Sequence, residues 1–178
     1  YFVVSAHREE NVDSPQNFSD FLDSLKAIRD RYSKRVIVST HPRTRKKMES
    51  LGVASLGEGV EFMKPLGLFD YIKLQKEAFC VISDSGTITE ESSILGFSAI
   101  TIRQAHERPE GMDQGTLIMS GLKSDAVLNS IDIVTTQAAT FCRSSEIVPD
   151  YNVPNVSTKV LRVIVSYVDY INRTVWSK

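Results

Sequence analysis

Short apolar runs rich in β-branched residues alternate along the whole chain with segments of helical periodicity. Six such runs are candidate strands: residues 1–5, 36–39, 60–63, 78–83, 99–102 and 117–119. Helix signals lie between them, beginning with Ser14-Pro15, which offers an N-cap and a first-turn proline ahead of a stripe of apolar residues at steps of three and four. This alternation is typical of βαβ units. We therefore predict an α/β fold, a parallel sheet with helices on both faces.

Further helices follow from the same periodicity. They are predicted at residues 46–51, 68–75, 87–95, from 124 onward and at 156–171. Gly96 ends the third of these, and an irregular stretch is expected from about 140 to 155. With 178 residues and no internal repeat or linker, the chain is expected to form a single domain over residues 1–178.

Charge and composition narrow the functional classes. A formal net charge of -1 gives no overall attraction to nucleic acid or to a membrane surface, so any anion site must be local. No apolar run approaches the ~20 residues that span a bilayer, and no signal-type segment opens the chain, so we expect a cytoplasmic protein. Cys80 and Cys142 lack metal-ligand spacing and are interpreted as reduced thiols. No metal site is predicted.

The most informative segment, SDSGTITEE, places a glycine-containing polar turn between a buried strand and a helix. The helix then opens at the carboxyl edge of the sheet, where its free N–H groups and its dipole favour a phosphate. Ser85 and Thr87 add hydroxyl donors, and Gly86 allows close approach to the backbone. One turn later, either Glu90 or Glu91 can reach ribose hydroxyls in the cleft. Ordinary helix capping is the alternative interpretation.

A second polar segment, RQAHERPEGMD, follows the next strand and is interpreted as a loop. Arg103 and Arg108 can hold a pyrophosphate in two-pronged geometry, and Glu107 lies between them. Because the segment starts at the carboxyl end of a strand, it is expected to face the same crevice. The alternative is a solvated charged loop with internal ion pairs.

Histidines follow the first two predicted strands. His7 lies in AHREEN and His41 in STHPRT, each directly after an apolar run. A histidine has an unperturbed pKa of about 6.5, so His7 is a candidate proton donor or acceptor near neutral pH. A purely structural histidine is the alternative. Three polar clusters are thus predicted to converge on one edge of the sheet.

Together, AHREEN, STHPRT, SDSGTITEE and RQAHERPEG resemble the C-terminal Rossmann-like domain of the non-hydrolysing UDP-N-acetylglucosamine 2-epimerase family, over essentially the whole chain. The resemblance implies one half of a GT-B-type two-domain enzyme, with the N-terminal catalytic domain absent here and a homodimer for the full-length protein. The chain begins with Tyr1, as expected of a piece of a longer protein. The final helix would reach back toward the missing half, and the isolated chain would bind weakly and turn over nothing.

The resemblance also implies roles for residues around the predicted phosphate site. Ser85, Gly86 and Thr87 would contact the phosphates, although Thr87 stands where the family commonly has a second glycine. His41 and Arg103 would flank the diphosphate.

Other roles implied by the resemblance concern the nucleoside and the sugar. Glu91 would contact the ribose and Tyr71 would lie near the uracil. His7 matches the family's active-site histidine. Arg8 and Glu10 match positions that bind a second, regulatory UDP-N-acetylglucosamine in some bacterial members.

The family's reaction expels UDP across the C1–C2 bond and removes the C2 proton, leaving a 2-acetamidoglycal; UDP is re-added after protonation on the other face. No nicotinamide or metal is required. The barrier falls when charge on the departing diphosphate is stabilised. The substrate pair would be UDP-GlcNAc/UDP-ManNAc or the pair that yields UDP-N-acetyl-L-fucosamine, whose branch the motif wording resembles more closely. Two alternatives remain: the donor domain of a UDP-sugar-dependent GT-B glycosyltransferase, and a non-catalytic sugar-nucleotide-binding module.

Overall fold

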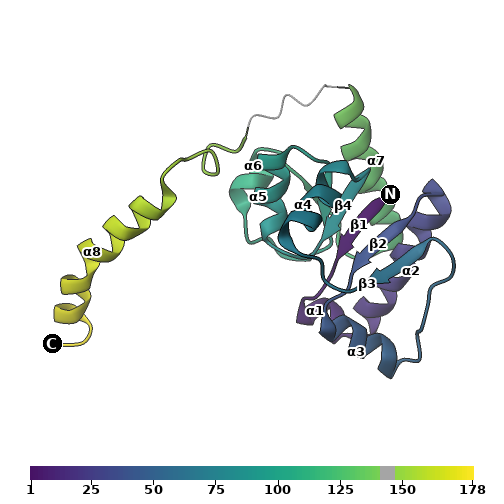
Figure 1. Ribbon diagram of the computed structural model, residues 1–178, viewed down its shortest axis with the longest axis horizontal. Helices are drawn as coiled ribbons and strands as arrows, with labels where there is room; N and C mark the ends of the chain where they lie inside the picture. The colour runs from purple at the N-terminus through teal and green to yellow at the C-terminus, as the bar shows by residue number, and fades with distance from the viewer. Residues whose placement is uncertain (141–146) are drawn as a thin grey trace.

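The computed structural model describes residues 1–140 and 147–178 and contains a six-stranded parallel sheet (Figure 1). Its strands are β1 (Phe2–Ser5), β2 (Val36–Ser39), β3 (Val60–Met63), β4 (Cys80–Ser83), β5 (Ala99–Thr101) and β6 (Ile118–Met119). They lie in the order β3-β2-β1-β4-β5-β6, with each neighbouring pair parallel. This is the strand order of the Rossmann fold, in which strand addition reverses direction between β1 and β4. The predicted α/β sheet is confirmed.

Helices cover both faces of the sheet, as predicted. The helices are α1 (Glu9–Val12), α2 (Pro15–Tyr32), α3 (Pro42–Ser50), α4 (Leu68–Glu77), α5 (Thr87–Leu95), α6 (Pro109–Asp113), α7 (Ser124–Thr140) and α8 (Val156–Thr174). In β1, Phe2 and Val4 join the apolar cluster beneath α2 and α7, whereas Val3 joins a second cluster with residues of α4 and α5. Because successive side chains of a strand point to opposite faces of the sheet, β1 contributes residues to both cores.

The termini of two predicted helices are confirmed by their capping geometry. The side chain of Ser14 accepts a hydrogen bond from the backbone N–H of Asn17, and Pro15 begins α2. Gly96 ends α5 in the left-handed conformation, at φ 69°, where a residue without a Cβ is least strained. The local sequence therefore sets where both helices begin or end.

Three helical segments differ from the prediction. α3 begins at Pro42 rather than near residue 46, because His41 caps it by accepting the N–H of Arg43. Only Thr44 and Met48 of this basic helix are buried, so it lacks an apolar stripe that would mark its start. The short helix α6 lies in the segment that was predicted to be a loop, and α1 lies in AHREEN, where no helix was predicted.

The predicted C-terminal helix is confirmed as α8, but none of its residues is buried. Figure 1 shows it extending away from the sheet. Residues 147–155 contain no helix or strand, as expected, whereas residues 141–146, including Cys142, lie outside the described part. Cys80 is a fully buried free thiol, and burial raises its pKa to about 12. No helix within the described ranges is long and apolar enough to cross a membrane.

Candidate functional site

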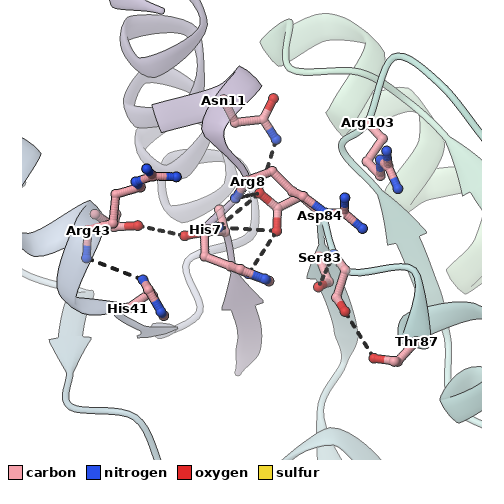
Figure 2. Close-up of polar contacts among 12 residues, drawn as sticks. His7, Arg8, Asn11, His41, Arg43, Ser83, Asp84, Thr87 and Arg103 are labelled. Atoms are coloured by element: carbon pink, nitrogen blue, oxygen red, sulfur yellow. Dashed lines mark hydrogen bonds and ion pairs between the residues drawn. The ribbon is translucent and has the colours of Figure 1, made fainter. Parts of the chain in front are cut away.

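The carboxyl ends of four strands bring the predicted site residues to one edge of the sheet. His7 and Arg8 follow β1, His41 follows β2, the segment 84–87 follows β4, and Arg103 follows β5. β1 and β4 are hydrogen-bonded neighbours at the point where the strand order reverses. Ligands of open α/β sheets bind at this reversal point, outside the carboxyl ends of the strands. Figure 2 shows the side chains gathered there.

The junction between β4 and α5 has the geometry of an anion site. Gly86 is the N-cap of α5, and no side chain of the described residues caps the helix. The hydroxyls of Ser85 and Thr87 lie 3.0 Å apart and hydrogen-bond each other. The N–H groups of Ile88 and Thr89 bond to the backbone carbonyls of Ser85 and Gly86, and the positive end of the helix has no side-chain cap at Gly86.

A carboxylate of the protein itself occupies this junction. Oε2 of Glu107 accepts a hydrogen bond from Nη2 of Arg8 at 2.8 Å and lies 2.8 Å from Nη1 of Arg103. A Cβ placed on Gly86 would lie 2.8 Å from the same oxygen. The hydrogen bond from Arg103, followed by that from Arg8, lowers the pKa of Glu107. The remaining cavity is about 10 Å³, room for about one water molecule. The junction thus already holds an anion.

Arg103 contributes a buried guanidinium to this cluster. Arg103 is only 8% exposed. Its Nη2 lies 3.5 Å from the Glu10 carboxylate, and its Nε has no hydrogen-bond partner among the described residues. Burying an incompletely paired charge costs free energy. Binding of an anion that completes the contacts of Arg103 would therefore be favourable. The predicted residues Arg8, Glu10, Arg103 and Glu107 thus lie together.

The two adjacent glutamates of α5 face different neighbours. Nε of Arg108 donates to Glu90 at 2.7 Å, whereas Nε2 of Gln75 donates to Glu91 at 2.6 Å. Gln75 is fully buried, and burial together with the nearby charge of Glu91 raises the pKa of Tyr71 to about 12. Tyr71, Gln75 and Glu91 form a second polar group between α4 and α5, separate from the arginine cluster. Arg108 binds Glu90 and also lines the junction, with its guanidinium 4.0 Å from the position of a Cβ on Gly86.

His7 is held by Asp84, a residue for which the sequence pattern predicted only a place in a turn. Asp84 has no exposed surface, and its Oδ1 lies 3.2 Å from Nδ1 of His7. The hydrogen bond to Asp84 raises the pKa of His7. The ring centroids of His7 and His41 are 5.6 Å apart. The available signal for Asp84 was a carboxylate placed immediately after a fully buried strand.

The charged segment after β5 is not a freely solvated loop. Ion pairs join Glu107 to Arg8 near β1 and Arg108 to Glu90 on α5. Glu110 also accepts a hydrogen bond from the hydroxyl of Tyr151 at 2.7 Å. Across the ranges that the structure describes, no group of three or more His, Cys, Asp or Glu side chains is placed to hold a metal ion.

Known proteins resemble the chain in both sequence and structure. Residues 1–165 match the sequence model of the UDP-N-acetylglucosamine 2-epimerase family. The UDP-N-acetylglucosamine 2-epimerase of Methanococcus maripaludis is 33% identical over 135 residues, which cover 74% of this chain and 37% of that protein.

Two solved structures share the fold over most or all of the chain. The UDP-N-acetylglucosamine 2-epimerase from Rickettsia bellii superposes with a TM-score of 0.83 at 49% identity, covering 100% of this chain and 47% of that one. The Methanocaldococcus jannaschii enzyme in complex with UDP-GlcNAc and UDP superposes with a TM-score of 0.82 at 25% identity, covering 93% and 45%. The chain therefore spans less than half the length of these relatives.

Proposed function

This chain belongs to the UDP-N-acetylglucosamine 2-epimerase family, and from that membership we propose that it supplies the nucleotide-binding half of a UDP-sugar 2-epimerase. The observation that carries the proposal is the junction of β4 with α5, where two arginines already hold a carboxylate beside the N-terminus of the helix. In the proposed enzyme a second domain faces this edge of the sheet and completes the sugar site.

The diphosphate of the UDP-sugar is proposed to replace the carboxylate of Glu107 at the junction. It would receive hydrogen bonds from the first turn of α5 and from the hydroxyls of Ser85 and Thr87, and charge from Arg8 and Arg103. A guanidinium matches the oxygen spacing of a phosphate and remains charged at all relevant pH values. These groups interact most strongly with the diphosphate when negative charge accumulates on it as it leaves, so they lower the barrier to its departure.

The nucleoside is proposed to lie along the polar group between α4 and α5. Glu91 is already an acceptor there, since Gln75 donates to it at 2.6 Å, and its carboxylate can accept from two ribose hydroxyls. Tyr71, on the facing helix, is partly buried and offers a ring against which the uracil can pack. Glu90 has no such role, because its carboxylate is bound by Arg108.

The proposed chemistry is elimination followed by re-addition. The C1–O bond breaks as the C2 proton leaves, the electron pair of the C2–H bond forms the C1–C2 double bond, and UDP departs with the C1–O electrons. Protonation of C2 on the opposite face and return of UDP to C1 give the epimer. His7, beside the junction and hydrogen-bonded to Asp84, is proposed to exchange a proton in this cycle.

Exchange with deuterated water tests the proposed reaction. The two-domain enzyme is incubated in deuterated water with UDP-GlcNAc and, separately, with the 2-epimeric pair that yields UDP-N-acetyl-L-fucosamine. Deuterium at C2 of the recovered UDP-sugar is expected, because the carbon is deprotonated and reprotonated in each cycle. The motifs of this chain resemble those of the branch that forms UDP-N-acetyl-L-fucosamine, so faster exchange is expected for that substrate pair. Transfer of the sugar to an acceptor without deuterium at C2 would instead indicate a glycosyltransferase.

Substituting the two glutamates of α5 tests the nucleoside site. Glu91→Ala is expected to weaken UDP binding about 10-fold or more, because it removes a charged hydrogen-bond acceptor. Glu90→Ala is the matched control, with the same side chain removed one position earlier, and is expected to change the Kd less than threefold. Isothermal titration of the two-domain enzyme with UDP measures both values. Equal losses of affinity would contradict a ribose contact specific to Glu91.

A further inference from the structure

Asp84 connects the segment that follows β4 with the segment that follows β1. It follows β4 directly, one residue before the anion junction, yet its carboxylate binds the segment that follows β1 (Figure 2). Oδ2 accepts the backbone N–H groups of His7 and Arg8, both at 2.9 Å, and the side-chain amide of Asn11 at 3.1 Å. Oδ1 lies on the imidazole side, 3.2 Å from Nδ1 of His7. Oδ1 also accepts the backbone N–H of His7, at 3.1 Å, so the two oxygens share this donor, whereas Arg8 and Asn11 donate to Oδ2 alone.

The charge state of Asp84 determines where the proton of His7 resides. Burial alone would raise the pKa of Asp84, but hydrogen bonds from His7, from the backbone N–H of Arg8 and from Asn11 outweigh it and lower the pKa below its ordinary value. An ionised carboxylate only accepts hydrogen bonds. The short contact between Oδ1 and Nδ1 therefore requires the proton on Nδ1, and in the neutral ring Nε2 is then an acceptor.

We propose that Asp84 is a positioning residue that fixes His7 in the tautomer with its proton on Nδ1 and leaves Nε2 as the proton-exchanging atom. This inference rests on the proposed epimerase function for its catalytic consequence, but the tautomer itself does not. The His7 side chain is 39% exposed, and Nε2 lies on the side of the ring away from Asp84. A proton taken by Nε2 makes an imidazolium that the buried carboxylate stabilises.

The charged and titratable groups around the imidazole act in opposite directions. Asp84 raises the pKa of His7 through the hydrogen bond and through its charge, whereas partial burial and the positive charge of Arg8 lower it. His41 faces the ring from the end of β2, at 5.6 Å between centroids. The net direction is upward, so removing the Asp84 charge is expected to lower the pKa of His7.

Asp84→Asn reverses the tautomer while keeping the segment after β1 in place. Three donors converge on the Oδ2 position, and only one of them, the N–H of His7, also reaches Oδ1, so the amide oxygen of the asparagine is expected at the Oδ2 position. The amide nitrogen then takes the Oδ1 position and donates toward Nδ1 of His7. The neutral ring must carry its proton on Nε2, and the atom proposed to accept a proton is blocked.

Nitrogen-15 NMR of the histidine-labelled chain measures this switch directly. The native chain is expected to show His7 with the proton on Nδ1 and a pKa above that of an unperturbed histidine. Asp84→Asn is expected to show the proton on Nε2 and a lower pKa. An unchanged tautomer and pKa would overturn the proposal.

Steady-state kinetics of the two-domain enzyme measure the catalytic consequence. Asp84→Asn is expected to lower kcat about 100-fold or more with KM within a few-fold, the scale of lost acid-base catalysis. The acidic limb of the kcat/KM profile, set by protonation of His7, should move to lower pH. Native kcat in a variant whose tautomer has switched would overturn the proposal.

Asn11→Ala is the matched control for loosening of the same segment. It removes one donor to Oδ2 and leaves the contact between Oδ1 and His7 intact, so the native tautomer is expected. A switched tautomer in Asn11→Ala would show that local packing, and not the Asp84 charge, sets the proton, and would also overturn the proposal. Absence of C2 exchange in the native two-domain enzyme would contradict the proposed function, whereas the NMR result stands or fails separately.

Discussion

His7→Ala in the two-domain enzyme is expected to lower kcat by about 100-fold or more while raising KM only a few-fold. The imidazole is proposed to exchange the C2 proton, and acid-base catalysis contributes about 10²–10⁴ in rate. The carboxylate of Asp84 keeps its backbone donors in this variant, so the fold should be retained. Initial rates of C2 epimerisation over a range of UDP-sugar concentrations separate the two parameters.

His41→Ala is the matched comparison for this prediction. His41 lies close to His7, but the family resemblance implies a role beside the diphosphate, so its removal is expected to act mainly on KM. Unchanged kcat in His7→Ala would remove His7 from the chemistry, whereas a larger kcat loss in His41→Ala would exchange the two roles.

Gly111→Ala is expected to destabilise the chain by about 1–3 kcal/mol, the usual cost of overpacking a tight contact. Gly111 lies in α6 against α5, and a Cβ at this position would overlap Cγ2 of Thr89, a residue that is 2% exposed. The Thr89 side chain or one of the two helices must then move. The midpoint of urea unfolding, with its slope unchanged, measures the loss.

Two further variants locate the cause of that loss. Thr89→Ser deletes the overlapping methyl, so the double variant is expected to be more stable than Gly111→Ala alone. Gly67→Ala, where a Cβ would meet only the Asp70 carboxylate at 3.8 Å, is expected to change stability by less than about 1 kcal/mol. Similar losses at Gly67 and Gly111 would contradict the packing explanation.

The sheet and its long helices could be predicted because their signals are local and repeated. Each strand is a short apolar run, and α2 and α8 contain several turns over which an apolar stripe can be recognised. α1 and α6 have four and five residues, too few for periodicity to be visible. α3 is a basic helix whose start depends on the His41 cap, and its two buried side chains form no clear stripe.

The residues at the edge of the sheet were predictable, but their partners were not. Strand ends placed His7, Arg103 and Ser85 at one edge, because all strands of a parallel sheet end there. The contact of His7 with Asp84 joins positions 77 residues apart, and that of Arg8 with Glu107 joins positions 99 apart. No local pattern encodes such pairs. The same limit explains why Glu107 was not expected to fill the junction.

Because the carboxylate of Glu107 already binds Arg8 and Arg103, an anionic ligand must replace it to bind at the junction. Arg8 and Arg103 share the carboxylate of Glu107 before any ligand arrives, so an anion that replaces it gains only the difference between its own attraction to the two arginines and that of Glu107. A lone monovalent anion offers the guanidiniums little that Glu107 does not already provide. In the proposed enzyme, a polyvalent diphosphate, with several oxygens to share between two cations and a helix terminus, is expected to displace it.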